Sequence, residues 1–434
     1  MKLRRLHLDN FRAFQATTVE LDPQLTLVLG GNAAGKTALL DGIAVALGSL
    51  FQGIDESPSR HIRKEEARRS VFTINGVVDL HASWPVVVEA TGSMRDPGDP
   101  AGPPLELTWR RTLEGPDRRT TRQGSKNLET VGQAYQEQVR AGQLISLPVI
   151  ALYGTQRLWL RKKATEGVTG VGNRFDGYAD CLDIAATERL LTDWMKQRTL
   201  IQVQQGRPHP QLAAVTLAIS TCLNEVSRVW FDLAHDEIRF ERGSNPLNVE
   251  SFSMLSDGYR SVIAMVADLA RRAAVLNPQH GEQACQLAEG VVLIDELDLH
   301  LHPAWQRRIV ADLQRTFPRL QVIATTHSPQ VLSSVRREQV RVLSGSSLRP
   351  FLEHVEGRDS NALLEDVFGV SARPAAVESE LKQIFDLLDD ERFAEARSKL
   401  DTVRTRLGED DAAVARAQWV LDTEAPSETS MPQG

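Results

Sequence analysis

The chain has 434 residues, with 50 Lys and Arg against 57 Asp and Glu, so its formal net charge is −7. Hydrophobic residues make up 41 % and charged residues 25 %. This composition is typical of globular proteins and excludes intrinsic disorder, collagen-like repeats and small disulfide scaffolds. The length allows two or three structural units, at roughly 100–200 residues per domain.

Composition also bears on the cellular compartment. No stretch approaches the ~18 apolar residues that a membrane-spanning helix needs, and the alternating start Met1–Leu8 is too polar for a signal peptide. The three cysteines, Cys181, Cys222 and Cys285, are far apart and show no metal-ligand spacing. We therefore expect a cytoplasmic protein with reduced, buried thiols and no contact with a membrane.

The first half of the chain is rich in short apolar runs that predict strands. They lie at residues 3–8, 18–21, 25–29, 71–74, 77–82, 86–90, 105–110 and 147–153. The run 25–29 ends in Gly30-Gly31 and is followed at 37–50 by a strongly apolar segment that predicts a buried helix. A strand, a tight turn and a helix are therefore expected in succession.

The second half alternates between helical and strand patterns. Helices are expected over most of 176–235 and at 259–276 and 303–317, and strands at 290–295 and 320–325. This alternation indicates an α/β fold with a largely parallel sheet covered on both faces. From residue 376 two amphipathic stripes, at 377–388 and 393–407, predict a helical hairpin, and a polar tail at 423–434 is expected to be disordered.

Residues 30–37 fit the pattern G-x-x-x-x-G-K-[ST] between the expected strand and helix. They are Gly30, Gly31, Asn32, Ala33, Ala34, Gly35, Lys36 and Thr37. Glycines let backbone N–H groups surround phosphates, and the helix N-terminus adds positive potential. Lys36 would reach the β- and γ-phosphates of a nucleotide and Thr37 would ligate Mg²⁺. An accidental glycine-rich turn is the alternative, which the flanking strand and helix disfavour.

Two carboxylates follow the apolar run 291–294. Ligands of open α/β sheets bind at the carboxyl ends of strands, so Asp295 and Glu296 would face the nucleotide. Asp295 would hold Mg²⁺, and Glu296 would act as the general base for the attacking water. A solvated strand end is the alternative interpretation.

Two further segments carry candidate phosphate contacts. In Leu255–Ser261, Ser256 can simply cap the helix that follows, or its hydroxyl and the backbone of Gly258 can bind a γ-phosphate held by another subunit. His327 stands just past the strand 320–325, where it could hydrogen-bond the γ-phosphate, although a lone histidine is more often structural.

Together these motifs resemble the ABC-type ATPase head of the AAA family, in its RecF/SMC/OLD-like branch, over about residues 1–50 and 250–335. The resemblance implies a head with a phosphate-loop parallel or mixed sheet, a helical lid subdomain and a C-terminal helical hairpin. It also implies that two heads pair head-to-tail around two ATP molecules, with Ser256 and Gly258 acting in trans. Asp257 and Tyr259 stand where that family usually has Gly and Gln.

The same resemblance implies a glutamine at the end of a strand as a further ligand of the nucleotide and Mg²⁺. Gln156 is the candidate, with Arg157 as its rival, and a generic loop glutamine is the alternative.

The resemblance also divides the chain. We expect an N-terminal ATPase lobe with a β-rich insertion at 1–175, a helical lid at 176–250 and a lobe with the trans-acting segment, the carboxylates and His327 at 251–350. A helical region at 351–422 and the tail would follow.

A narrower resemblance is to the PtuA-like ATPases of Septu and retron anti-phage systems. It rests on Leu255–Arg260, on Asp295–Pro303 and on Asp359–Asn361 with Phe368–Val370. It implies a homodimer or higher oligomer that hydrolyses ATP and regulates a separate HNH nuclease, with DNA or RNA as a further partner. A RecF-like repair ATPase that binds DNA without a toxic partner is the main alternative, and a transporter subunit is a third.

Recurrent basic pairs at 60–69, 110–111, 118–126 and 161–163 would bind phosphate backbones only if they converge on one face.

Overall fold

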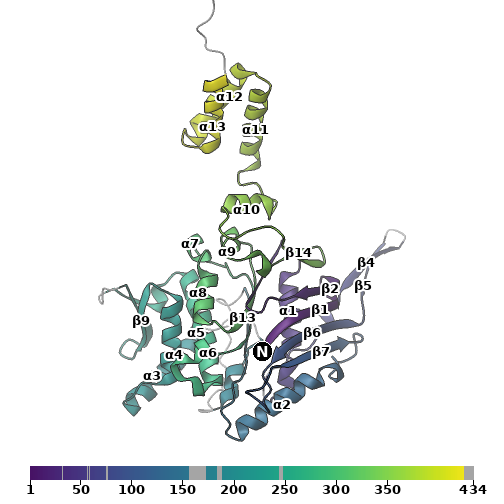
Figure 1. Ribbon diagram of the computed structural model, residues 1–434, viewed down its shortest axis with the longest axis vertical. Coiled ribbons are helices and arrows are strands. Elements are labelled where there is room, and N and C mark those ends of the chain that lie inside the picture. The colour runs from purple at the N-terminus through teal and green to yellow at the C-terminus, as the bar shows by residue number, and fades with distance from the viewer. Residues whose placement is uncertain are drawn as a thin grey trace, which may run out of the picture. The chain divides into compact units, whose positions relative to one another are not determined.

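A computed structural model describes residues 1–31, 33–55, 57, 59–74, 77–155, 173–182, 188–243 and 248–424 (Figure 1). The chain divides into two compact units, Met1–Arg358 and Asp359–Gly434. The expected start of the C-terminal helical region, residue 351, lies close to this division.

The first unit is built around a six-stranded sheet. Its strands, in spatial order, are β15 (Ser347–Pro350), β14 (Val340–Ser344), β3 (Leu25–Gly30), β13 (Leu320–Thr325), β12 (Gly290–Ile294) and β8 (Val149–Tyr153). All neighbouring pairs are parallel except β14 with β15. Every residue of β8, β12 and β13 is buried, because both faces of the sheet are covered. The expected α/β fold with a mixed, mainly parallel sheet is confirmed.

The helix α1 (Lys36–Leu47) lies between this sheet and a second, antiparallel one (Figure 1). The second sheet consists of β2 (Phe14–Glu20), β1 (Lys2–Phe11), β6 (Val86–Met94) and β7 (Leu105–Leu113). Enclosure between two sheets explains why every residue of α1 except Thr37 is buried. A separate hairpin is formed by β4 (Arg69–Ile74) and β5 (Val77–Ala82).

The helix α2 (Lys126–Arg140) packs on β7 and was not expected from the sequence. Its buried residues Leu128, Val131 and Tyr135 have helical spacing, but polar residues separate them. The basic loop before it and the irregular strands around it concealed this periodicity.

On the other side of the parallel sheet lie helices and a small antiparallel sheet (Figure 1). The helices are α3 (Glu188–Gln205), α4 (Pro210–Cys222), α5 (Asp257–Leu276), α6 (Ala284–Leu287), α7 (Pro303–Gln306), α8 (Ile309–Thr316) and α9 (Pro329–Leu332). The strands are β9 (Val226–Asp232), β10 (Glu237–Arg242) and β11 (Val249–Ser251).

The expectation of a helical lid at 176–250 is wrong for its last third, which contains β9, β10 and the start of β11. The buried positions of β10, and those of β9 from Val229 onward, alternate with more exposed ones, which is the two-residue period of a strand. The expected helix 303–317 is also interrupted, between α7 and α8.

The second unit contains α10 (Ser360–Asp366), α11 (Ala375–Asp389), α12 (Phe393–Leu407) and α13 (Ala412–Glu424). The expected hairpin of α11 and α12 is present, but α13 packs against both and completes a three-helix core. Of the expected tail, residues 425–434 lie outside the described residues. In the described part of the chain, no helix combines the length and the apolar character needed to cross a membrane.

A buried ion pair joins α5 to the edge of the parallel sheet. The Asp268 carboxylate accepts hydrogen bonds from Tyr153 Oη (2.9 Å), Arg272 Nε (2.7 Å) and Arg271 Nη2 (2.8 Å). Burial alone would raise the pKa of Asp268, but the two guanidinium groups outweigh it and hold this pKa well below its ordinary value. The pair therefore stabilises the fold above the pKa of an unfolded aspartate, and this contribution is lost as the pH falls through the lowered pKa.

We predict that Asp268→Asn lowers the free energy of unfolding by about 3–5 kcal/mol, because it leaves Arg272 buried beside a neutral partner. Urea unfolding of the full chain measures this effect. The control is Asp236→Asn, which removes an exposed pair with Lys196 and should cost at most about 1 kcal/mol. Equal unfolding midpoints for Asp268→Asn and the wild type would contradict the prediction.

Candidate functional site

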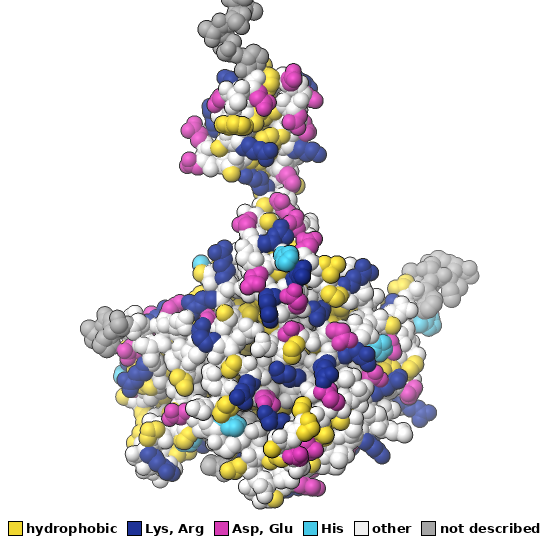
Figure 2. Space-filling model, in the orientation of Figure 1, with side chains coloured by type: hydrophobic (Ala, Val, Ile, Leu, Met, Phe, Trp, Pro, Cys, Tyr) yellow, Lys and Arg dark blue, Asp and Glu magenta, His cyan; other side chains and the backbone are white. Residues whose placement is uncertain are grey.

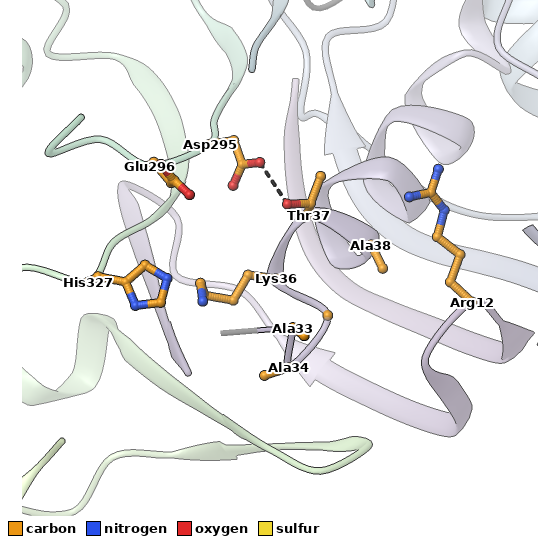
Figure 3. Close-up of a pocket in the computed structure, with 10 residues that line it drawn as sticks. Arg12, Ala33, Ala34, Lys36, Thr37, Ala38, Asp295, Glu296 and His327 are labelled. Carbon is orange, nitrogen blue, oxygen red and sulfur yellow. Dashed lines mark hydrogen bonds between the residues drawn. The ribbon is translucent and has the colours of Figure 1, made fainter. Parts of the chain in front are cut away.

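A pocket of about 300 Å³ lies at the carboxyl ends of β3 and β12 (Figure 3). It is lined by Arg12, Ala33, Ala34, Gly35, Lys36, Thr37, Ala38, Asp295, Glu296 and His327. Segments far apart in the sequence meet here because β3, β13 and β12 are parallel neighbours whose carboxyl ends share one edge.

The loop before α1 is shaped to receive an anion. Gly35 has φ 105°, and a Cβ there would lie 3.0 Å from the Cβ of Ala13, so glycine is favoured by both conformation and space. Gly35 is the N-cap of α1 and offers no capping side chain. The first intrahelical bond runs from Leu39 N to Gly35 O, so the N–H groups of Lys36, Thr37 and Ala38 have no intrahelical partner and suit a ligand.

Lys36 supplies a positive charge beside this helix end. Its ammonium group donates hydrogen bonds to the carbonyl oxygens of Gly30 (2.9 Å) and Gly31 (3.0 Å). Burial lowers the pKa of Lys36, while the carboxylates of Asp295 and Glu296 oppose the shift. A largely buried cation beside open N–H groups fits the phosphates of a nucleotide.

The carboxylate of Asp295 is held from two sides by hydroxyl groups. Thr37 Oγ1, on α1, donates to Oδ2 at 2.7 Å, and Thr325 Oγ1, at the end of β13, donates to Oδ1 at 2.6 Å. Thr325 Oγ1 also accepts the N–H of Glu296 at 2.7 Å. Hydroxyl and carboxylate oxygens are hard ligands, so Thr37 and Asp295 fit Mg²⁺.

Glu296 and His327 project into the same pocket (Figure 3). The backbone of Glu296 is in the left-handed region, with φ 49°. Its N–H bond to Thr325 helps to hold this unusual conformation. Asp298 accepts hydrogen bonds from Thr326 Oγ1 (2.5 Å) and from the N–H of His327 (3.4 Å), which fixes the backbone next to the pocket.

The structure brings together most of the site residues expected from the sequence. Ala33 to Thr37, Asp295, Glu296 and His327 line the pocket. Asn32, Gln156 and Arg157 lie outside the described residues. Ser256 and Gly258 do not line the pocket of their own chain. Ser256 occupies the N-cap position of α5, but its side chain makes no capping hydrogen bond.

Sequence reasoning missed two residues that shape the site. Thr325 carried no signal beyond its place at a strand end. Arg12 was not expected at the site, yet it lines the pocket, and its guanidinium forms ion pairs with Asp41 (2.7 Å) and Glu66 (3.0 Å).

Comparison with known proteins agrees with this geometry. A family model described as an AAA domain matches residues 5–227, which is just over half of the chain. The chain belongs to the AAA domain family. This membership confirms the ATPase expected from the sequence. A second model, described as "AAA domain, putative AbiEii toxin, Type IV TA system", matches residues 223–333 of this AAA protein.

The chain is similar to a retron ATPase and to a Septu protein. It is 23 % identical to the retron Ec83 probable ATPase of Escherichia coli, over 97 % of this chain and 87 % of the relative. It is 32 % identical to the Septu protein PtuA of Bacillus thuringiensis, over 35 % of this chain and 41 % of the relative. The expected resemblance to retron and Septu ATPases is confirmed.

Among solved structures, the SMC head bound to the C-terminal winged-helix domain of ScpA matches with a TM-score of 0.47 and 16 % identity. The match covers 80 % of this chain and 96 % of that one.

We predict that Thr325→Val slows ATP hydrolysis by roughly 10- to 100-fold, since a hydrogen bond to a charged group contributes about 1.5–3 kcal/mol. The substitution keeps the side-chain shape but leaves Asp295 Oδ1 and the Glu296 N–H without this partner. Steady-state phosphate release measures the loss. Thr325→Ser retains the hydroxyl and should restore most of the turnover, and wild-type turnover in Thr325→Val would refute the role.

Proposed function

We propose that the pocket binds ATP with Mg²⁺ and hydrolyses it to ADP and phosphate. One observation carries this proposal: Lys36, the hydrogen-bonded pair Thr37–Asp295 and Glu296 line the same pocket at the N-terminus of α1. Lys36 and the loop N–H groups bind the phosphates, and Thr37 and Asp295 hold Mg²⁺. When bound, this ion neutralises charge that develops on the phosphate oxygens.

Glu296 is the general base in this proposal. Its carboxylate accepts a proton from water as the water oxygen attacks the γ-phosphorus. The bond from that phosphorus to the bridging oxygen breaks, and ADP leaves with the electron pair. His327 donates a hydrogen bond to the γ-phosphate, and Gln156 serves as a further ligand of the nucleotide and Mg²⁺.

The active form in this proposal is a head-to-tail dimer or a higher oligomer. Ser256 is exposed, its side chain does not cap α5, and it lies outside the pocket of its own chain. Ser256 and the backbone of Gly258 are therefore suited to bind the γ-phosphate held by a second copy.

We further propose that the dimer regulates a separate effector nuclease, of HNH type, in the cytoplasm during anti-phage defence. The similarity to a retron ATPase over nearly the whole chain and to a Septu protein over part of it supports this role. On this account residues 1–175, 176–250 and 251–350 build the ATPase head, and the helical region at 351–422 is a separate part of the chain.

Glu296→Gln should abolish most turnover, by about 10²–10⁴-fold, because it removes the base while keeping the side-chain shape. It should also trap an ATP-bound dimer, which sedimentation with ATP and Mg²⁺ would detect. Glu282→Gln, at an exposed glutamate of the same unit, is the matched control and should behave as the wild type. Unchanged hydrolysis by Glu296→Gln would overturn the assignment.

A second candidate function is a RecF-like ATPase that binds DNA and acts without a toxic partner. One observation favours it: two basic segments lie side by side. Thr120 Oγ1 accepts the N–H of Ile62 (3.1 Å) and donates to its carbonyl oxygen (3.2 Å). This contact places the segment that carries the exposed residues Arg63 and Lys64 beside the segment that carries the exposed residues Arg118, Arg119, Arg122 and Lys126, and we call these six residues the basic cluster.

Other basic residues are structural. Arg111 is fully buried and donates to the carbonyl oxygen of Thr121 (3.1 Å), and Arg60 pairs with Asp41 and Glu66. The pair at 161–163 lies outside the described residues. Over the visible face, Lys and Arg are spread among Asp and Glu (Figure 2), so attraction of nucleic acid would depend on the cluster rather than on net charge.

The double variant Arg118→Glu/Arg119→Glu should weaken binding of duplex DNA and reduce the slope of log affinity against log salt by about 1 for each lost phosphate contact. Filter binding over a salt series measures both quantities. Arg397→Glu, on α12, is the matched control. A variant with the wild-type affinity and slope would remove the support for this second function.

A further inference from the structure

The start of α5 is packed against the loop that follows Glu296 in the same chain. A Cβ on Gly258 would lie 2.3 Å from the carbonyl oxygen of His300, so the two backbones are in close contact and glycine is required. The loop itself is a compact turn, in which Leu299 N donates to Glu296 O (2.9 Å) and Leu301 N donates to Asp298 O (3.0 Å). This turn therefore runs from the proposed base to the proposed trans-acting segment.

The ring of Tyr259, next to Gly258, contacts two side chains from other elements. The guanidinium carbon of Arg242, on β10, lies 4.5 Å from the ring centroid. The ring of Trp305, on α7, lies 4.2 Å away, centroid to centroid, at an interplanar angle of 58°. A cation over one face and a tilted indole against the ring are both attractive arrangements.

The hydroxyl group of Tyr259 is also bound. It donates a hydrogen bond to the carboxylate of Glu225, which in turn accepts one from Arg308 Nη1 at 3.0 Å. The guanidinium carbon of Arg308 lies 5.1 Å from the centroid of Trp305. Glu225 and Trp305 thus connect Tyr259 to the residues just before α8, and the five side chains form one cluster.

The contacts of Tyr259 place it away from the nucleotide pocket of its own chain. Tyr259 does not line the pocket, and its hydroxyl is directed to Glu225. Because it lies in the first turn of α5, fixing its ring fixes the rotation and the axial position of Ser256 and Gly258.

We propose that Tyr259 is a positioning residue that ties Ser256 and Gly258 to the loop following Glu296 in the same chain. The proposal rests on the proposed function, in which these two residues complete the site of a second copy.

Tyr259→Ala removes every contact of the cluster with α5. It should lower kcat for ATP hydrolysis by about 10- to 100-fold, as expected for a displaced contact. The dissociation constant of a fluorescent ATP analogue should stay unchanged, because the phosphate loop of the same chain is intact. Tyr259→Phe keeps the ring between Arg242 and Trp305 and should restore most of kcat. A parallel loss of nucleotide affinity and thermal stability in Tyr259→Ala, without rescue by Tyr259→Phe, would show a merely structural role and overturn the proposal.

Mixing two impaired variants gives the decisive readout. Tyr259→Ala retains its phosphate loop, and Lys36→Ala retains an intact Tyr259, so a mixed dimer contains one complete composite site. The mixture should hydrolyse ATP faster than either variant alone. No gain on mixing, while the wild type hydrolyses ATP and forms a dimer with it, would overturn the role of Tyr259. A wild type that neither binds ATP nor dimerises would instead overturn the proposed function.

Discussion

The Asp295 carboxylate is the point at which three segments of the first unit meet. One oxygen accepts the hydroxyl of Thr37 on α1, and the other accepts the hydroxyl of Thr325 on β13. This arrangement requires β3, β13 and β12 to be parallel neighbours, because only then do the phosphate loop, the carboxylates and the Thr325–His327 segment share an edge. The strand order of the sheet therefore determines which side chains meet in the pocket.

The same strand order also brings the charged groups of the pocket together. Burial lowers the pKa of Lys36, whereas Asp295 and Glu296 raise it, so the two carboxylates partly offset the effect of burial on the Lys36 ammonium group. In such a site Lys36 would balance the negative charge of bound phosphates, and the carboxylates would balance the positive charge of a divalent cation. Outside the pocket, the cluster around Tyr259 holds the start of α5, which carries the two residues suited to a second copy.

The central α/β unit could be predicted from sequence because its signals are local. A buried strand, the glycine-rich loop and the carboxylates after residue 294 each occupy a few consecutive residues. By contrast, α2 was missed because polar residues separate its apolar positions. The strand β9 was taken for a helix because its first buried residues, Val226 and Val229, are three positions apart, which also fits a helix. Thr325, and the partners of Tyr259 on β10 and α7, depend on contacts between distant segments, and no local pattern marks them.

The most direct test of the account is calorimetric titration of the full chain with ATP and Mg²⁺, beside the Lys36→Ala variant. We expect saturable binding by the wild type that needs Lys36, because its ammonium group lies beside the loop that precedes α1. Equal binding by both proteins, or no binding by the wild type at saturating nucleotide, would contradict it.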